Sequence, residues 1–404
     1  MNPKPLLAVV SPSLDKSHGT ERLMLKWVSQ LNTLFEIHVY SQHVEDLDLS
    51  KITWHRISKI PGPHLFNFLW WFFANRLRRE WERRFCGLRY DLIFSPGPNC
   101  LDADVISVHI VFAEYMKKTQ SEGVRMRQSM WSYPRRLHRR LYYRLIVSLE
   151  RRAYTRPDIT LILTAKRTST ALEEHYGRRD HWPVVSTGLD HEMFNPARRF
   201  TLRERARKEL GLREGEFVLL LIGNDWRNKG VPVLLEALEH LRELPVCLRV
   251  VSREDPSDAL TLVTRKGLED RVRFLPPRKD VEFYYAAADA YVGASLEDAF
   301  ALPPAEAMAC GLPVIVSASA GVSEIVTHGA DGLILDEPRD AATLAGMIRR
   351  LHGDIAFRTQ LGEKAAETTR QYTWERNSRE LAAIFEEILR RKSDLAAQVL
   401  TQEL

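Results

Sequence analysis

Short apolar runs alternate with longer amphipathic stretches in both halves of the chain. In the N-terminal half the runs lie at residues 6–10, 37–40, 92–95, 105–108 and 159–163. In the C-terminal half they lie at residues 217–222, 248–251, 272–275, 290–292 and 314–316. The runs have the length of buried strands, and intervening stretches such as residues 21–34 and 231–244 have helical spacing. The alternation predicts βαβ units with parallel sheets, an α/β fold of two Rossmann-like domains.

The length of the chain also indicates two domains, because 404 residues exceed the size of one ordinary core. The pattern becomes irregular between residues 183 and 196, where Gly188 and the Asn195-Pro196 pair interrupt it. We therefore expect an N-terminal domain over residues 1–190 and a C-terminal domain from residue 191. Two such domains would face each other across a cleft.

Composition narrows the class of protein further. Hydrophobic residues make up 45% of the chain, as in globular proteins. The longest apolar run, residues 69–74, is far shorter than the roughly 20 residues that cross a bilayer. The four cysteines are too irregularly spaced for a disulfide framework or a metal knuckle; they are Cys86, Cys100, Cys247 and Cys310. We expect a cytoplasmic protein without a transmembrane helix.

Two stretches of the N-terminal half are strongly basic. Residues 125–156 contain ten arginines and a single acid, Glu150. Residues 70–85 interleave five arginines with large apolar side chains, a mixture typical of an amphipathic helix at a membrane interface. Both stretches are equally compatible with solvated helix faces that pack on the core. We keep both interpretations. A helix at the membrane interface would bring the protein into peripheral contact with an anionic inner membrane face.

The segment from residue 295 to residue 315 carries the most chemistry. A strand ends in a loop with two adjacent acids, Glu297 and Asp298, and Pro303-Pro304 then open a helix that contains Glu306. Free N–H groups at such a helix start, near Ala301 and Leu302, suit a diphosphate. A carboxylate one turn into the helix suits the hydroxyls of a ribose.

This segment resembles the E-x7-E signature of the family-4 retaining glycosyltransferases, which have the GT-B fold. The resemblance implies that Glu306 binds the nucleotide ribose and that Glu297 or Asp298 contacts the donor sugar. Phe300, Ala301 and Leu302 would line the donor site. The glycines that usually follow the first acid are replaced by Ala299 and Ala301. The resemblance also implies that residues 377–404 form a helix returning to the N-terminal domain, after a C-terminal domain over residues 191–376.

A second part of the resemblance is the loop from Gly223 to Gly230, between a strand and a helix. Lys229 matches the family lysine that contacts the donor phosphates. The usual arginine is Asn224 here, so we assign its role to Arg227. The amino-acid sequence of this loop is similar to that of the corresponding loop in lipopolysaccharide-core glucosyltransferases.

The N-terminal half offers fewer candidates. Gly19 and Thr20 stand between the first strand and first helix, where the family has a glycine-rich loop beside the donor phosphates, although Gly19 fits a plain turn equally well. His109 ends a strand and resembles the family histidine near the donor sugar. A lone histidine is more often structural, but ligands bind at strand ends in doubly wound sheets.

The resemblance implies a retaining transfer of a hexose from a nucleotide-diphosphate sugar, which we expect to be a UDP-sugar. The acceptor would be a saccharide or lipid-linked saccharide of the cell envelope. We expect no cofactor and no metal, because the Asp102-Ala103-Asp104 pair precedes its strand. The alternatives are a nucleotide-sugar epimerase or a phosphorylase of the same fold, and a catalytically dead scaffold. Nucleic-acid binding would leave the acid motif unexplained.

Overall fold

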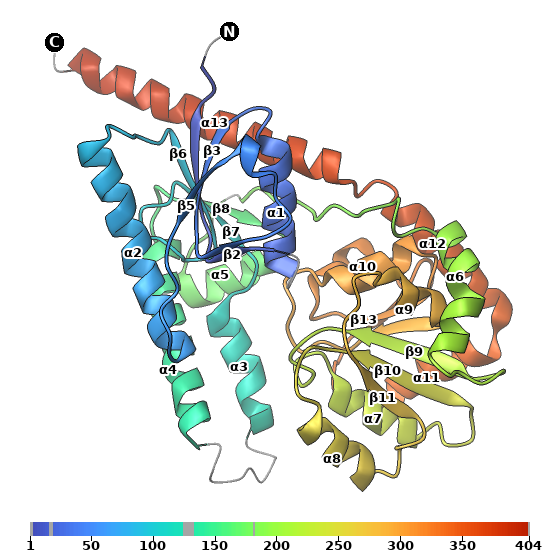
Figure 1. Cartoon of the computed structure of the whole chain (residues 1–404). Coiled ribbons are helices and arrows are strands. Elements are labelled where there is room, and N and C mark those ends of the chain that lie inside the picture. The colour runs from blue at the N-terminus through green and yellow to red at the C-terminus, as the bar shows by residue number, and fades with distance from the viewer. Residues whose placement is uncertain (1–2, 16–18, 124–132, 181, 403–404) are drawn as a thin grey trace. The chain divides into compact units, whose positions relative to one another are not determined.

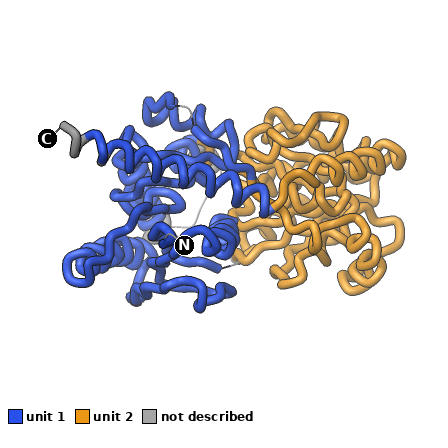
Figure 2. The backbone as a smooth tube through the Cα atoms, turned by 90° about the horizontal axis from the view of Figure 1, so that it is seen from above, with its two compact units in different colours: residues 1–117, 125–186, 374–404 blue, residues 118–124, 187–373 orange. Residues whose placement is uncertain are grey.

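A computed structural model describes residues 3–15, 19–123, 133–180 and 182–402 of the chain. The chain divides into two compact units, coloured separately in Figure 2. Unit 1 comprises residues 1–117, 125–186 and 374–404, and unit 2 comprises residues 118–124 and 187–373. Within the described residues, no helix combines the length and the apolar character needed to span a membrane.

Unit 1 is built on a six-stranded parallel sheet with the order β5-β3-β1-β6-β7-β8, beside a short β2-β4 pair (Figure 1). Its strands are β1 (Leu6–Val10), β2 (Ser13–Leu14), β3 (Glu36–Ser41), β4 (His43–Val44), β5 (Thr53–Arg56), β6 (Leu92–Pro96), β7 (Val105–Val108) and β8 (Thr160–Leu163). Its helices are α1 (Gly19–Leu31), η1 (Leu49–Lys51), α2 (His64–Phe85), α3 (Phe112–Gly123, the last residues counted with unit 2), α4 (Tyr133–Tyr154), α5 (Thr168–Tyr176) and α13 (Trp374–Gln402).

Successive side chains of these strands point to opposite faces of the sheet, and they contribute to two apolar cores, one on each face. On one face, α1 and α13 cover a core that includes Trp27, Phe94 and Phe385. On the other face, α2, α4 and α5 cover a core around Trp71 and Tyr154. Both faces of the sheet are therefore buried, as parallel sheets require.

Unit 2 repeats the architecture with the strand order β11-β10-β9-β12-β13-β14, again all parallel. Its strands are β9 (Phe217–Ile222), β10 (Val246–Val251), β11 (Val272–Leu275), β12 (Ala290–Gly293), β13 (Val314–Ser317) and β14 (Leu333–Leu335). Its helices are α6 (Pro196–Glu209), α7 (Val231–Glu239), α8 (Ser257–Arg265), α9 (Glu282–Ala287), α10 (Leu302–Ala309), η3 (Gly321–Ile325), α11 (Ala341–Gly353) and α12 (Ile355–Thr369).

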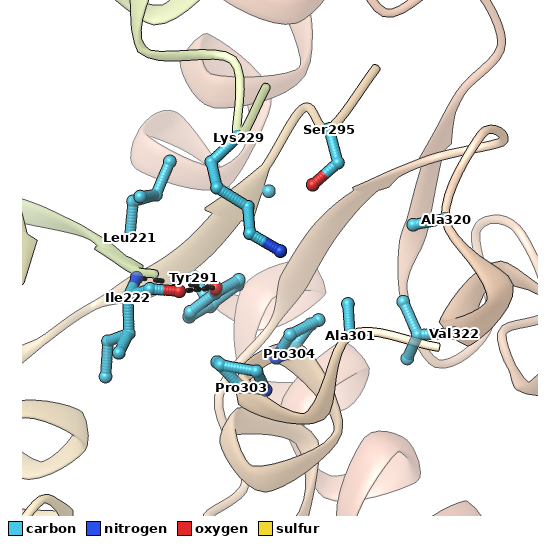
Figure 3. A pocket seen from close by; sticks show the side chains of 11 residues that line it. Leu221, Ile222, Lys229, Tyr291, Ser295, Ala301, Pro303, Pro304, Ala320 and Val322 are labelled. Atoms are coloured by element: carbon cyan, nitrogen blue, oxygen red, sulfur yellow. Dashed lines mark hydrogen bonds between the residues drawn. The ribbon is translucent and has the colours of Figure 1, made fainter. Parts of the chain in front are cut away.

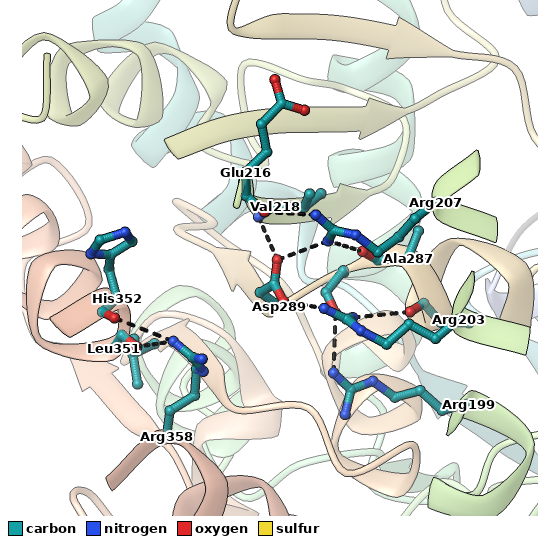
Figure 4. Close-up of polar contacts among 12 residues, drawn as sticks. Arg199, Arg203, Arg207, Glu216, Val218, Ala287, Asp289, Leu351, His352 and Arg358 are labelled. Atoms are coloured by element: carbon teal, nitrogen blue, oxygen red, sulfur yellow. Dashed lines mark hydrogen bonds and ion pairs between the residues drawn. The ribbon is translucent and has the colours of Figure 1, made fainter. Parts of the chain in front are cut away.

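Three arginines of α6, spaced four residues apart, hydrogen-bond this helix to the rest of unit 2 (Figure 4). Arg199 and Arg203 donate to the carbonyl of Ala288, which follows α9, and Arg207 donates to the carbonyl of Ala287. Carbonyls at a helix end lack partners within the helix, so these contacts satisfy them. The carboxylate of Asp289 pairs with Arg203 and Arg207 and accepts from the backbone of β9. Burial and the neighbouring Arg203 lower the pKa of Arg199 to about 10.

The prediction of two parallel α/β sheets is confirmed, with differences at the sheet edges. The edge strands β5 and β14 were not expected. Residues 53–56 are Thr-Trp-His-Arg, which lacks the apolar run of a central strand, and β14 has only three residues. The basic stretch 125–156 forms α4 from residue 133 onward, whereas Arg125 and Arg127 lie outside the described residues. The second basic stretch is the C-terminal part of α2.

Candidate active site

A pocket in unit 2 lies where the order of the strands reverses direction. The strand β9 is flanked by β10, which follows it in sequence, and by β12, which comes later. The loops that leave β9 and β12 therefore diverge and open a crevice at the carboxyl ends of the strands, the usual ligand position in such sheets. The pocket is lined by Leu221, Ile222, Lys229, Tyr291, Gly293, Ser295, Ala301, Pro303, Pro304, Ala320 and Val322 (Figure 3).

The loop after β9 is packed tightly at two of its glycines, and one of them, Gly230, has no room for a larger residue. A Cβ on Gly230 would lie 2.3 Å from the carbonyl oxygen of Ala294, and the φ of Gly230 is +86°. A Cβ on Gly223 would lie 3.0 Å from Cε of Lys229. The first glycine lets the loop rest on the end of β12, and the second leaves room for the lysine side chain.

Lys229 reaches the pocket from this loop. Figure 3 shows its ammonium group and the hydroxyl of Ser295 pointing into the space beside Ala301. The ammonium forms an ion pair with the carboxylate of Asp298, and both side chains are largely buried. Lys229, which we expected to contact the donor phosphates, is therefore paired at the pocket with Asp298, one of the two acids that we expected to contact the donor sugar.

The side chain of Asn228 joins the basic loop to the loop that carries the acids. Its Nδ2 donates to the carbonyl oxygen of Glu297 at 2.8 Å, and its Oδ1 accepts from the N–H of Glu297 at 3.2 Å. The backbone of Leu296 also donates to the carbonyl of Asn228. Asn228 is only 6% exposed, so these bonds are shielded from water. The clamp fixes Glu297 and the neighbouring Asp298 relative to Lys229.

The acid loop is held from its other side by the segment after β13. The N–H of Asp298 donates to Ser319, and the carbonyl of Asp298 accepts from Gly321. The carbonyl of Phe300 accepts from Val322 at 2.7 Å. Backbone hydrogen bonds on both sides therefore leave the position of Asp298 well determined.

The helix α10 begins with an unusual backbone. Ala301 has φ +67° and ψ 90°, in the region that favours glycine. The next residues are Leu302, Pro303 and Pro304, and the prolines have no N–H. The start of α10 consequently offers a ligand the N–H groups of Ala301 and Leu302, fewer than an ordinary helix start.

Glu306 lies in the second turn of α10 and is 2% exposed. The hydroxyl of Tyr285, on α9, donates to Oε2 of Glu306 at 2.7 Å. Burial and the nearby Glu306 raise the pKa of Tyr285 well above its usual value, so this hydroxyl remains a donor. Glu306 is therefore oriented by a buried tyrosine.

Arg227 and Phe300 are not among the residues that line the pocket. The guanidinium of Arg227 stacks on Trp226, 4.0 Å from the ring centre, and donates to Asp258 of α8 at 2.8 Å. Asn224 accepts from the backbone of Arg253 after β10. Phe300 is buried in an apolar cluster of unit 2. The structure thus gives all three residues contacts within the scaffold of the loops.

The candidates in unit 1 follow its strands along the chain. Gly19 and Thr20 are the first residues of α1. His109 follows β7, and its Nε2 lies 2.9 Å from the hydroxyl oxygen of Ser107. Desolvation lowers the pKa of His109 to about 4, so the imidazole is neutral at physiological pH.

The sequence reasoning missed two residues of the site, Asn228 and Tyr285. Asn228 had a weak signal, because it stands directly before Lys229 in a loop otherwise rich in charged residues. Tyr285 lay in an expected apolar helix, where a tyrosine is ordinarily a core residue. The sequence around Asn228 or Tyr285 does not indicate which residue each side chain contacts in the fold.

The domain that contains this pocket has known relatives. Residues 203–368 match the family model of glycosyl transferases group 1, so the chain carries a glycosyltransferase group 1 domain. The two parallel Rossmann-like sheets have the GT-B fold, as predicted from the sequence.

Individual relatives are similar to parts or to the whole of the chain. The D-inositol 3-phosphate glycosyltransferase of Arthrobacter sp. is 32% identical over 228 residues, which cover 54% of this chain and 53% of the relative. That of Corynebacterium aurimucosum is 31% identical over 239 residues, 56% of each chain. The chain thus spans about half the length of the curated relatives it matches.

Two solved structures show the same fold over nearly the whole chain. WaaG, a glycosyltransferase involved in lipopolysaccharide biosynthesis, has a TM-score of 0.76 at 20% identity, covering 94% of this chain and 99% of WaaG. HepE of Anabaena, in complex with UDP and glucose, has a TM-score of 0.69 at 19% identity, covering 94% of this chain and 99% of HepE.

Proposed function

We propose that the protein is a retaining glycosyltransferase that transfers a hexose from a nucleotide-diphosphate sugar, most simply a UDP-sugar, to a saccharide or lipid-linked saccharide of the cell envelope. The observation that carries the proposal is the pocket at the strand reversal of a group 1 domain, where Lys229, Asp298 and the start of α10 meet. Two proteins of the same fold support it: HepE forms a complex with UDP and glucose, and WaaG is involved in lipopolysaccharide biosynthesis.

The chemistry of the pocket suits departure of a diphosphate. As the bond between the sugar and the diphosphate weakens, negative charge gathers on the phosphate oxygens. Lys229 and the N–H groups of Ala301 and Leu302 would stabilise that charge, and they are in place before the reaction begins. Lys229 forms an ion pair with Asp298. Asp298 would release the lysine to the phosphate and turn its carboxylate to the sugar hydroxyls.

Retention of the anomeric configuration would follow if the departing diphosphate accepts the proton of the acceptor on the same face of the sugar. No side-chain nucleophile is needed for this step. We assign ribose binding to Glu306, oriented by Tyr285, and a place beside the donor sugar to the neutral His109. We propose that the reaction needs neither a metal ion nor a cofactor.

The test begins with the donor. UDP, GDP and ADP, with and without their sugars, are added to the purified chain and the melting temperature is recorded, since a ligand that binds the native state raises it. We expect one diphosphonucleotide to stabilise the chain and Lys229→Ala to weaken that binding at least about tenfold, or 1.4 kcal/mol. Lys364→Ala, which changes an exposed lysine on α12, is the matched control.

The transfer reaction is tested with the stabilising donor. Conversion of the sugar nucleotide is followed with saccharide and lipid-linked acceptors in EDTA, and the anomeric configuration of the product is determined by NMR. Full activity in EDTA and a retained configuration are expected. Stabilisation by none of the nucleotides, or loss of activity in EDTA that Mg²⁺ restores, would contradict the proposal.

A further inference from the structure

The helix α2 in unit 1 is apolar on two opposite faces. Its inner face buries Phe68, Trp71 and Phe72 in the core of unit 1. Its outer face carries six large apolar side chains that are between 45% and 74% exposed: Phe66, Trp70, Phe73, Leu77, Trp81 and Phe85. A helix on a protein surface ordinarily turns polar side chains to water, so this outer face calls for another partner.

The six side chains form one continuous stripe. Successive members are three or four residues apart, and a helix has 3.6 residues per turn, so all six project from the same side. The stripe runs along nearly the whole helix, a length of about 28 Å. Single exposed apolar residues are common on protein surfaces, but a stripe of this length marks an interaction surface. We call these six residues the outer stripe.

Basic residues border the outer stripe. The helix α2 contains five arginines and two glutamates, and Arg76, Arg78, Arg83 and Arg84 are exposed. Both glutamates are paired with arginines of the same helix, Glu80 with Arg83 and Arg84, and Glu82 with Arg78. The guanidinium of Arg78 lies over the ring of Trp81. The surface around the stripe therefore carries net positive charge.

The neighbouring helix α4 extends this charge. It packs against α2, and the two helices lie side by side in Figure 1. The backbone N–H of Leu65 on α2 donates to His138 on α4. It contains seven arginines and one glutamate, Glu150, which is fully buried. The exposed arginines of α4 include Arg139, Arg140 and Arg144. The two helices together form a surface with many more positive than negative groups.

We propose that the outer stripe of α2 docks on the surface of an anionic lipid bilayer. The helix would lie in the plane of the interface, with its aromatic and aliphatic side chains among the acyl chains and its arginines at the lipid phosphates. Arginine and tryptophan suit this position because their apolar parts are buried while their polar ends stay at the headgroups. Negative lipid matches the charge of α2 and α4, whereas a second copy of the same basic face would be repelled.

The proposal is tested by flotation of the full chain with vesicles of phosphatidylcholine, with or without phosphatidylglycerol. We expect binding to the anionic vesicles that decreases as salt is added, because salt screens the arginines. The double variant Phe73→Ser, Leu77→Ser should bind at least about tenfold more weakly, since both side chains lie in the middle of the stripe. Phe200→Ser, Leu260→Ser is the control, because these residues are exposed on α6 and α8 of unit 2.

A second measurement locates the contact. Leu77→Cys in a Cys86→Ser background places a single accessible thiol in the stripe, because the other three cysteines are buried. A fluorophore sensitive to polarity at this thiol should shift to shorter wavelength with anionic vesicles. An unchanged spectrum despite flotation would show that another surface binds lipid and would overturn the proposal.

Two further outcomes would overturn it. One is flotation to the same extent with and without phosphatidylglycerol, or to the same extent in the natural protein and in the Phe73→Ser, Leu77→Ser variant. The other is a dimer in lipid-free solution that the serine variant converts to a monomer, which would show that the stripe covers a second copy of the chain. Nucleotide-induced thermal shifts of the same variants distinguish these results from a failure of the proposed transfer reaction, because α2 contributes nothing to the pocket of unit 2.

Discussion

Replacement of Asn228 by alanine would test whether the two loops of the pocket act as one element. The amide of Asn228 satisfies both backbone groups of Glu297, so its removal leaves one donor and one acceptor without these partners. An unsatisfied buried polar group costs about 1–3 kcal/mol, and Asn228 is itself buried. We therefore expect Asn228→Ala to lower the free energy of unfolding of unit 2 by about 2 kcal/mol.

The effect on ligand binding should exceed what lower stability alone produces. Without the amide, Glu297 and Asp298 lose their fixed position relative to Lys229, and donor binding must order the loop again. We expect the affinity for the nucleotide sugar to fall about tenfold, equal to 1.4 kcal/mol, while the affinity for the free nucleoside changes little. Urea unfolding gives the first quantity and titration calorimetry gives the second.

Asn224→Ala is the matched control for this experiment. Asn224 lies in the same loop and accepts from Arg253, but none of its hydrogen bonds described here reaches the acid loop. Its removal should cost a similar free energy of unfolding without a selective loss of sugar-nucleotide affinity. Equal losses of affinity in both variants, or a stability of Asn228→Ala within about 0.5 kcal/mol of the natural protein, would refute the reasoning.

Three further predictions concern single positions in the two units. Ala301→Gly should raise the free energy of unfolding by up to about 1 kcal/mol in urea titrations, because glycine adopts the φ of +67° without strain; a less stable variant would contradict this account. Asp289→Asn should lower the stability of unit 2 by about 2 kcal/mol, since Arg203 and Arg207 lose a partly buried partner; calorimetry measures the change, and an unchanged melting temperature counts against it. Burial raises the pKa of Glu150 to about 7 from 4.5, so unit 1 binds this proton more tightly when folded. That contribution is complete below pH 4.5 and is lost as the pH rises to 7, by roughly 3 kcal/mol; unfolding at pH 5 and pH 8 should show a smaller difference in Glu150→Gln than in the natural protein.

The central strands could be predicted from the sequence because each is a run of apolar residues. β9 matches its expected bounds, and β1 and β11 do so as well. The edge strand β5 escaped prediction because one side of it has no neighbouring strand, and its Thr-Trp-His-Arg sequence needs no apolar run. Apolar patterning reports burial on both faces, and an edge strand is only partly buried.

The site was predictable to the extent that local sequence determines local structure. The loop after β12, the proline start of α10 and the glycines after β9 all follow from residues close together in the chain. The bond between Tyr285 and Glu306 joins α9 to α10, and the bonds of Asn228 span 69 residues. Such pairs depend on strand order and register. The partner of Arg227 was equally unpredictable, because Asp258 comes from α8, which follows α7 and β10 in the chain.

The path of α13 has a consequence for biosynthesis. Residues 374–404 belong to unit 1, where Leu381, Phe385 and Ile388 share a core with Leu7 and Val9 of β1. A ribosome reaches α13 only after it has made all of unit 2. Unit 2 therefore has its complete set of core residues first. Until α13 is made, one apolar face of the sheet in unit 1 is covered by α1 but not by α13. We expect a chaperone to bind the part of this face that α13 later covers. Truncation after residue 373 would leave that part exposed permanently.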